Sequence, residues 1–121
     1  MAKRILIVED ERDVAMLLRN YLEFKGYEVE EAHSGADALK RIFKGGYDLV
    51  LLDYGMRDIK GDRLCQMARA EGATSKLPMI IVTAHVEVDD NLFKQWGATD
   101  VIYKPVNTDE LYSKVEKHLK Q

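Results

Sequence analysis

Four short runs of uninterrupted apolar residues constrain the fold of this chain more than any other feature of its sequence. They lie within the segments Arg4–Val8, Asp48–Asp53, Met79–Thr83 and Val101–Lys104. A strand that is buried on both faces is apolar continuously, whereas a half-buried strand alternates apolar and polar residues. A fifth segment, Tyr27–Glu31, alternates in this second way. The pattern therefore predicts a central parallel sheet covered by helices on both faces, with Tyr27–Glu31 as an edge strand.

Between the predicted strands the apolar residues recur with the period of a helix. The apolar stripes of five predicted helices are Val14, Leu17, Leu18, Tyr21 and Leu22; Leu39, Ile42 and Phe43; Leu64, Cys65, Met67 and Ala68; Val88, Leu92, Phe93 and Trp96; and Leu111, Val115, His118 and Leu119. Ser34, with Asp37 three residues later, and Thr108 are the predicted N-caps of two of these helices. Five strand–helix units joined by short loops predict a doubly wound α/β fold.

The length and composition of the chain exclude several classes of protein. Its 121 residues fit one domain, spanning residues 1–121. Cys65 is the only cysteine, which excludes an intramolecular disulfide and argues against a zinc site. The 18 basic and 21 acidic residues are mixed, without a basic cluster for nucleic acid or an anionic membrane. With no membrane-spanning stretch and no signal peptide, we expect a cytoplasmic protein.

Polar side chains stand where four of the predicted strands end. Glu9 and Asp10 follow the first strand, Asp53 ends the third, Thr83 ends the fourth and Lys104 ends the fifth. In a doubly wound sheet the carboxyl ends of the strands lie at one edge, and ligands bind there. We therefore expect three carboxylates, one hydroxyl and one ammonium in a single shallow pocket.

Carboxylates this close repel one another, by about 4 kcal/mol per pair at 4 Å and an effective dielectric constant of 20. Either one carboxylate stays protonated or a cation lies among them. Oxygen ligands favour Mg2+, with Mn2+ and Ca2+ as substitutes. Asp53 closes the central apolar strand and is the expected nucleophile, since a carboxylate that attacks phosphorus forms an aspartyl phosphate. Mg2+, Lys104 and Thr83 would then each bind one oxygen of the phosphoryl group.

Each of these residues, taken singly, also has a purely structural interpretation. An acidic pair such as Glu9-Asp10 commonly caps a helix N-terminus. An aspartate at the end of a strand is commonly a turn residue, and a lysine is commonly a solvated charge. The functional hypothesis depends on all five residues standing at equivalent strand ends of one regular alternation.

Over essentially its whole length the chain resembles the receiver domain of two-component response regulators, of the single-domain chemotaxis-regulator type. The matching motifs, in the family's order and spacing, are Ile5–Glu11, Asp48–Asp53 followed by Met56 and Gly61, Thr83-Ala84, Gly97-Ala98 and Lys104-Pro105. The resemblance implies a flavodoxin-like, five-stranded parallel sheet with strand order 2-1-3-4-5 and five helices. It also implies a cis bond between Lys104 and Pro105, which proline makes accessible.

The resemblance further implies Mg2+-dependent transfer of a phosphoryl group to Asp53 from the phosphohistidine of a sensor histidine kinase or a histidine phosphotransfer protein. The positions that match the family's site residues are, for the metal, Glu9, Asp10, Asp53 and the backbone carbonyl of Gly55, and, for the phosphoryl group, Thr83 and Lys104. Such a domain catalyses only its own phosphotransfer and dephosphorylation, so we expect a signalling domain and not an enzyme.

Three departures from the family pattern lie close to the expected site. Arg57 replaces the usual proline after Met56, which predicts a less rigid loop after the third strand. Gly55, two residues after Asp53, removes a side chain that commonly covers the phosphoryl site. His85 stands two residues after Thr83. We expect Gly55 and His85 to influence the lifetime of the phosphorylated form.

A fourth departure concerns signalling. Val101 stands where the family usually carries Tyr or Phe, so its coupling to Thr83 should be weakened or rerouted. Tyr103 faces the same side of the strand. We expect it to fill the core, with substitution for the missing ring as the less favoured alternative. Phosphorylation should alter the face formed by the fourth helix, fifth strand and fifth helix, which could also support a weak homodimer.

Other functions remain open at this stage. A protein-binding module with the same fold could act without phosphorylation. A flavodoxin-like cofactor binder fits less well, since the acidic loop Glu9-Asp10-Glu11 would repel a flavin phosphate, and a haloacid-dehalogenase-type phosphatase would need an acidic motif at another position. We expect no role for His33 or His118. Without an output domain after Gln121, the chain should act through a downstream partner, a relay or a phosphate sink, unless it is part of a longer protein.

Overall fold

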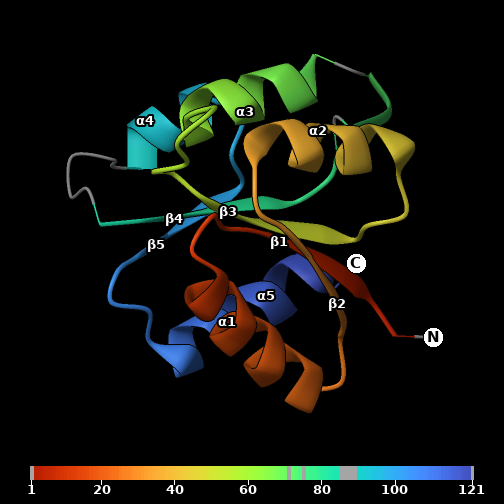
Figure 1. Ribbon diagram of the computed structural model, residues 1–121, viewed down its shortest axis with the longest axis vertical. Helices are drawn as coiled ribbons and strands as arrows, with labels where there is room; N and C mark the ends of the chain where they lie inside the picture. Colours follow the sequence, from red (N-terminus) through yellow and green to blue (C-terminus); the bar gives the residue numbers. More distant parts are fainter. Residues whose placement is uncertain (1, 71, 75, 85–89, 121) are drawn as a thin grey trace.

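The computed structural model describes residues 2–70, 72–74, 76–84 and 90–120 (Figure 1). Along the chain its elements are β1 Arg4–Val8, α1 Arg12–Phe24, β2 Glu28–Ala32, α2 Gly35–Lys44, β3 Leu49–Asp53, α3 Gly61–Arg69, a 3-10 turn at Gly72–Thr74, β4 Met79–Thr83, α4 Asp90–Gln95, β5 Asp100–Tyr103 and α5 Thr108–Leu119. The predicted bounds of β1 and β4 are confirmed, and those of β2, β3 and β5 differ by one residue at one or both ends.

The strands form one parallel sheet in the order β2-β1-β3-β4-β5, which confirms the expected topology. Helices α1 and α5 cover one face of this sheet, and α2, α3 and α4 cover the other (Figure 1). Crossovers between parallel strands are right-handed, and the strand order runs in one direction through α1 and in the opposite direction through α2, α3 and α4. The helix α1 therefore lies on the other face of the sheet from α2, α3 and α4. As predicted, β2 is an edge strand of the sheet.

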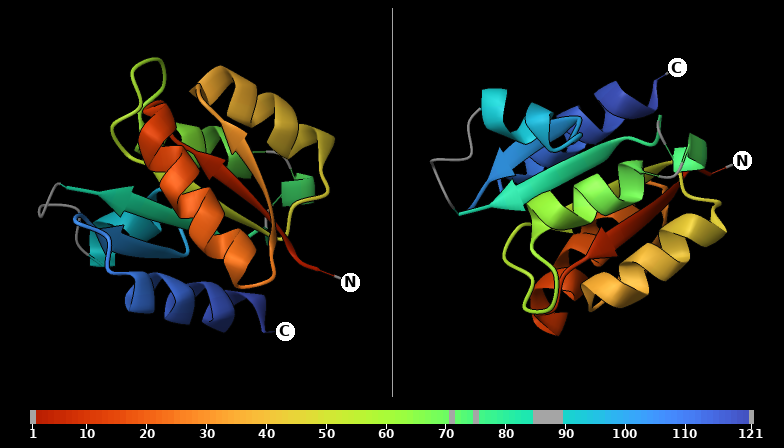
Figure 2. Two further views of the ribbon diagram at one scale, coloured as in Figure 1. Left: turned by 60° about the horizontal axis from the view of Figure 1, so that its bottom comes forward. Right: turned by 90° about the horizontal axis from the view of Figure 1, so that it is seen from above.

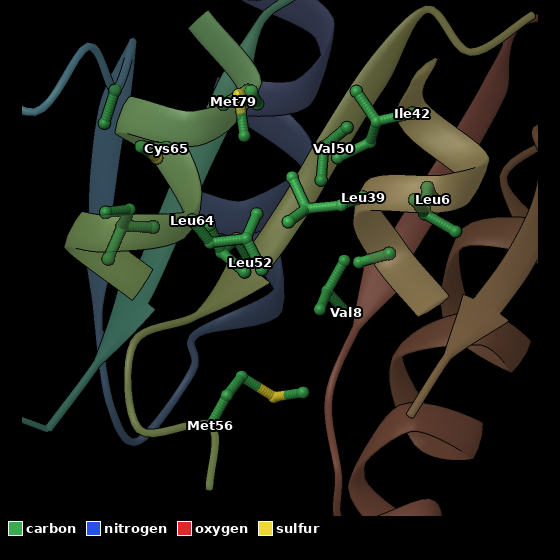
Figure 3. Packing of buried hydrophobic residues seen from close by; sticks show 14 of the residues in the cluster. Leu6, Val8, Leu39, Ile42, Val50, Leu52, Met56, Leu64, Cys65 and Met79 are labelled. Carbon is green, nitrogen blue, oxygen red and sulfur yellow. The ribbon is translucent and has the colours of Figure 1, made fainter. Parts of the chain in front are cut away.

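Two hydrophobic clusters fill the spaces between the sheet and its two helical layers. Ile5 and Ile7 of β1 belong to the cluster beneath α1 and α5, whereas Leu6 and Val8 belong to the cluster beneath α2 and α3 (Figure 3). Successive side chains of a strand point to opposite faces, so a strand between two layers must be apolar at every position. All five residues of β3 and of β4 are buried. The continuous apolar runs thus have the predicted cause.

Some predicted core residues are exposed. The side chains of Leu17 and Phe43 are 67% and 47% exposed, although both belong to predicted apolar stripes. Ala15, which the predicted stripe of α1 omitted, is fully buried together with Leu22. A helix lying on a flat sheet buries a narrow line of residues, and a small side chain on that line allows close approach. Val88, expected in the fourth stripe, lies outside the described residues.

The helix termini partly match the prediction. Ser34 caps α2, since its Oγ accepts a hydrogen bond of 3.1 Å from the backbone N–H of Asp37. The predicted cap Thr108 is wrong by one residue. Asn107 caps α5 instead, and its Oδ1 accepts a hydrogen bond of 3.0 Å from the N–H of Glu110. Across the described ranges, no helix combines the length and the apolar character that crossing a membrane requires.

Candidate functional site

The carboxyl ends of the strands converge at one edge of the sheet (Figure 2). Asp53 ends β3 and pairs with Val82, so the next residue of β4, Thr83, lies at the same edge. Thr83 in turn pairs with Tyr103 of β5, and Lys104 follows directly. Glu9 follows the end of β1, the neighbour of β3 on its other side. The parallel register therefore brings the predicted site residues together.

Three of these residues form a compact cluster of carboxylates. One carboxylate oxygen from each of Glu9, Asp10 and Asp53 can be chosen so that all lie within 4.8 Å of one another. Glu9 is 3% exposed and Asp53 is 9% exposed. The ammonium of Lys104 lies 3.1 Å from Asp53 Oδ1 and 3.7 Å from Glu9 Oε1. The arrangement is that of an oxygen-rich cation site beside a fixed lysine.

The electrostatics of the cluster show the cost of gathering these charges. Burial raises the pKa of Glu9 to about 7, and the charge of Asp53 adds to this effect. The hydrogen bond of 3.2 Å from the N–H of Glu11 to Glu9 Oε2 and the charge of Lys104 act in the opposite direction. Glu9 is therefore partly protonated near neutral pH in the metal-free protein. Protonation of one carboxylate, one of the two expected ways to relieve repulsion, is the way available without a metal ion.

Lys104 stays charged in this environment. Burial lowers its pKa, but the hydrogen bond and charge of Asp53 and the charge of Glu9 outweigh that effect, so the pKa is raised overall. Its bond to Pro105 is cis, as the resemblance implied. A charged ammonium held against Asp53 is suited to binding an oxygen of an anion placed on that carboxylate.

An open hollow of about 210 Å³ lies over Asp53. Its lining residues are Glu11, Asp53, Gly55, Thr83, Ala84 and Lys104. Thr83 itself is 1% exposed. A Cβ atom at Gly55 would lie 3.8 Å from Asp53 Oδ2, so a longer side chain at this position would reach over the carboxylate. The absence of a side chain at Gly55 keeps the hollow accessible to a tetrahedral anion and to water.

Two consecutive residues of the loop after β3, Arg57 and Asp58, form hydrogen bonds with distant parts of the chain. The backbone N–H of Arg57 donates a hydrogen bond of 3.2 Å to Asp10 Oδ2, and the Arg57 Nε lies 3.7 Å from the same oxygen. The carboxylate of Asp58 accepts hydrogen bonds of 2.9 and 3.0 Å from the N–H groups of Gly35 and Ala36, at the start of α2. The hydrogen bond from Gly35 is the main cause of the lowered pKa of Asp58. The sequence indicated a replaced proline at Arg57, but not that its N–H would contact Asp10.

Gly61, a residue of the family pattern, has a steric role at the end of this loop. A Cβ atom on Gly61 would lie 2.8 Å from the backbone Cα of Tyr54. The N–H of Gly61 also donates a hydrogen bond of 2.9 Å to the carbonyl of Tyr54. Any larger residue would push the start of α3 away from the residue that follows Asp53.

The departures in β5 have a mixed outcome. Val101 is 2% exposed and packs in the core beneath α3 and α4. Tyr103 is 37% exposed, so the expectation that it fills the core is wrong. Tyr103 is the last residue of its strand. His85 lies outside the described residues, and its expected influence stays a prediction.

An aromatic contact that sequence reasoning missed joins the site to α4. The rings of Tyr54, next to Asp53, and Trp96, next to the end of α4, are stacked with centroids 5.4 Å apart and planes inclined by 19°. Tyr54 and Trp96 are 42 residues apart, and no periodic pattern links them.

His118, to which no role was assigned, also has a partner, since its Nε2 lies 2.9 Å from Asp100 Oδ2. That contact fastens α5 to β5.

Comparison with known proteins identifies the family. Residues 5–116 match the response regulator receiver domain. The chain is 36% identical over 118 residues to the uncharacterized transcriptional regulatory protein YkoG of Bacillus subtilis, covering 97% of this chain and 51% of that protein. It is 34% identical over 119 residues to the response regulator ArlR of Staphylococcus saprophyticus, covering 98% and 53%. The chain thus spans about half the length of these curated relatives.

Solved structures agree with this result. A putative response regulator from Chloroflexus aurantiacus superposes with a TM-score of 0.93 at 32% identity, covering all of both chains. The response regulator TrrA of Thermotoga maritima, solved in complex with Mg2+-BeF, superposes with a TM-score of 0.87 at 38% identity, covering 97% of this chain and 99% of that one. Sequence, fold and the acidic edge of the sheet agree: the chain belongs to the receiver-domain family of two-component response regulators.

Proposed function

We propose that this receiver domain accepts a phosphoryl group on Asp53 from the phosphohistidine of a sensor histidine kinase or a histidine phosphotransfer protein. The observation that carries the proposal is the position of Asp53. Its carboxylate is nearly buried, lies 3.1 Å from the Lys104 ammonium, and faces an open hollow. Residues 1–121 would make up this single phosphoacceptor domain.

The residues of the cluster fit a magnesium ion. Glu9, Asp10 and Asp53 supply carboxylate oxygens, the donors that Mg2+ prefers, and the carbonyl of Gly55 is the fourth proposed ligand. The raised pKa of Glu9 indicates that the cluster carries more negative charge than the protein alone neutralises. When bound, Mg2+ would offset the repulsion between these carboxylates and an incoming phosphoryl group.

The side chains around Asp53 suggest how the transfer proceeds. An oxygen of Asp53 attacks phosphorus, the bond from phosphorus to the donor imidazole breaks, and its electron pair stays on the imidazole nitrogen. The ammonium of Lys104 and the hydroxyl of Thr83 would each bind one phosphoryl oxygen. Both residues line the hollow over Asp53, so their polar groups stand beside the place that the phosphoryl group would take.

An apolar groove beside the site is our proposed docking surface for the phosphoryl donor. The groove has a volume of about 450 Å³, and its lining residues are Val14, Leu17, Leu18, Tyr21, Lys104, Pro105, Val106 and Thr108. Leu17, which is 67% exposed, lies in this groove, and Lys104 lines both the groove and the hollow over Asp53. A protein that binds here through an apolar helix face could bring its phosphohistidine to Asp53.

Phosphorylation adds a charge of about −1.5 to −2 at Asp53 and would draw Thr83 and Lys104 toward the phosphoryl oxygens. The expected consequence is a shift of the face formed by α4, β5 and α5. A downstream partner, or a second copy of the chain in a weak homodimer, would bind this face. Because phosphorylation can move an equilibrium only through its different contacts in the two states, Lys104 and Thr83 are the contacts to test.

Mass spectrometry tests the proposal. The intact protein is incubated with acetyl phosphate, with and without Mg2+, and the gain of one phosphoryl group is measured. We expect the gain in the wild-type protein with Mg2+, its loss in Asp53→Asn, and its retention in Asp13→Asn, which changes an exposed carboxylate of α1. A wild-type protein that gains no phosphoryl group would instead favour a module that binds without phosphorylation, an alternative that the family comparisons do not favour.

A further inference from the structure

Arg57 places a positive charge directly on one of the proposed metal ligands. Its Nε lies 3.7 Å from Asp10 Oδ2, and its backbone N–H donates a hydrogen bond of 3.2 Å to the same oxygen. The Arg57 side chain is 90% exposed, whereas that of Asp10 is 17% exposed. The guanidinium thus approaches a largely buried carboxylate from the solvent side.

The charges of the site show what this contact does. The three carboxylates of Glu9, Asp10 and Asp53 face two cations, Lys104 and Arg57. Lys104 lies beside Glu9 and Asp53, and Arg57 lies beside Asp10. When all five groups are ionised, they carry one net negative charge that can attract a divalent ion. With a neutral residue at position 57 the remaining groups would carry two. A cation bound to Asp10 also meets the repulsion of the guanidinium on the same carboxylate.

We propose that Arg57 is a positioning residue that competes with the magnesium ion for Asp10 and thereby lowers the affinity of the site for the metal. This inference rests on the proposed function, because it takes Asp10 to be a metal ligand. The backbone N–H of Arg57 holds the Asp10 carboxylate in place. Its guanidinium offsets part of the negative charge that would attract the metal ion. Filling of the site then requires a higher concentration of free Mg2+ than it would without Arg57.

Calorimetric titration of the metal-free protein with Mg2+ tests the proposal through binding and not through activity. Arg57→Gln keeps the backbone N–H and the approximate length of the side chain but removes the charge. Arg57→Lys keeps the charge. Arg63→Gln, at an exposed position of α3, removes the same charge from the chain, and among the described residues Arg63 forms no ion pair with Asp10.

We expect Arg57→Gln to tighten the dissociation constant for Mg2+ about two- to fivefold relative to Arg63→Gln, the range expected for one exposed ion pair. Arg57→Lys should stay close to the wild-type protein. The difference should shrink in about 1 M salt, where the Debye length is about 3 Å. Equal or weaker Mg2+ binding by Arg57→Gln than by Arg63→Gln would overturn the role of Arg57 alone. A wild-type protein that binds no Mg2+ would overturn the proposed function, and the inference with it.

Discussion

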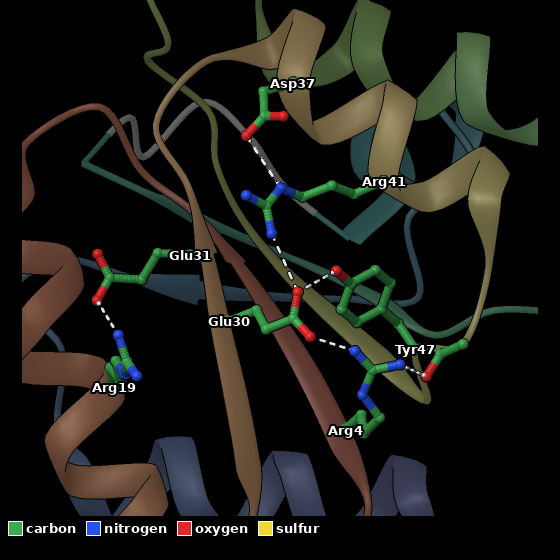
Figure 4. Close-up of polar contacts among 8 residues, drawn as sticks. Arg4, Arg19, Glu30, Glu31, Asp37, Arg41 and Tyr47 are labelled. Carbon is green, nitrogen blue, oxygen red and sulfur yellow. Dashed lines mark hydrogen bonds and ion pairs between the residues drawn. The ribbon is translucent and has the colours of Figure 1, made fainter.

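Two ends of the same sheet gather charged side chains in opposite ways. At the carboxyl ends of the strands, Glu9, Asp10 and Asp53 converge within 4.8 Å, and burial raises the pKa of Glu9 to about 7. Toward the amino ends, the carboxylate of Glu30 on β2 pairs with the guanidinium groups of Arg4 and Arg41 (Figure 4). Here the charges are matched, whereas at the site they are crowded.

The network around Glu30 is fully paired. The hydroxyl of Tyr47 donates a hydrogen bond of 2.7 Å to Glu30 Oε1, and Arg41 Nη1 lies 3.0 Å from the same oxygen. The hydrogen bond from Tyr47, followed by the hydrogen bond and charge of Arg4 and by the charge of Arg41, lowers the pKa of Glu30. Arg41 also pairs with Asp37 at 3.0 Å (Figure 4). The surroundings of Glu30 therefore stabilise its ionised form, whereas the surroundings of Glu9 destabilise the ionised form of that carboxylate.

The difference teaches that similar residues serve stability or function according to how they are matched. A carboxylate with several donors fastens an edge strand to its neighbours. Carboxylates that share too few cations destabilise the folded protein. Under the proposed function, a divalent ion bound among them would relieve that repulsion. The following substitutions test this contrast through the free energy of unfolding.

The largest effect should come from Glu9→Gln in the metal-free protein. The folded-state pKa of Glu9, about 7, lies above the ordinary value of 4.5, so its stabilising protonated form is lost as the pH rises through this window. We expect Glu9→Gln to increase the free energy of unfolding by about 1–3 kcal/mol at about pH 8, and by much less at about pH 4. Urea denaturation measures the difference, with the exposed Glu11→Gln as control. An equal pH dependence in Glu9→Gln and the wild-type protein would contradict the crowded site.

Magnesium should increase the free energy of unfolding by binding at the carboxylate cluster, and this gain should not depend on Glu30. At a tenfold excess over its dissociation constant, a ligand of the folded state adds about 1.4 kcal/mol to the free energy of unfolding. We expect this increment in the wild-type protein and in Glu30→Gln, and its loss in Glu9→Gln. The measurement repeats the urea denaturation with added Mg2+. An increment that also disappears in Glu30→Gln would show that the two ends of the sheet do not act separately.

Glu30→Gln should have the opposite sign to Glu9→Gln. The Glu30 side chain is 39% exposed, so solvent screening reduces the value of its ion pairs, and we expect a loss of about 1 kcal/mol at neutral pH. Because the folded-state pKa of Glu30 is lowered, this stabilisation is present above the ordinary pKa and disappears as the pH falls through the folded value. Thermal or urea unfolding measures it, with Glu28→Gln on the same strand as control. A stabilising Glu30→Gln would refute the contrast.

Tyr47→Phe should give the smallest effect. It removes the hydroxyl that donates to Glu30 but keeps the ring, whose centroid lies 4.9 Å from the guanidinium carbon of Arg4. We expect a loss of about 0.5–1 kcal/mol, typical of one hydrogen bond at a half-exposed position. Tyr27→Phe is the matched control in urea denaturation, since the Tyr27 hydroxyl has no hydrogen-bond partner in the described part of the chain. The prediction fails if the two phenylalanine variants unfold alike.

The pattern of apolar residues predicted much of the fold because it records burial directly. The strands were placed to within one residue at each end, and the sheet order that the resemblance implied is confirmed. The pattern was less informative for helix faces. Leu17 and Phe43 satisfied a helical period and yet are exposed, since a period does not show how wide a line of residues the sheet covers.

The site could be predicted only in part. Glu9, Asp53, Thr83 and Lys104 were placed correctly at one edge because each stands at the end of a strand, and parallel strands end together. The contacts of Arg57 with Asp10 and of Tyr54 with Trp96 were not predicted. Both contacts join segments that are far apart in the sequence, and no periodicity or motif predicts that such segments lie side by side.

The sequence by itself determined the layers of this protein and the edge at which its acidic residues gather, because alternation and strand ends are local properties of the chain. Only the tertiary structure decided how those acids behave. The proton on Glu9, the charge on Lys104 and the partner of Asp10 depend on burial and on neighbours supplied by several elements. A pKa is a property of the assembled surroundings, and those surroundings exist only after folding.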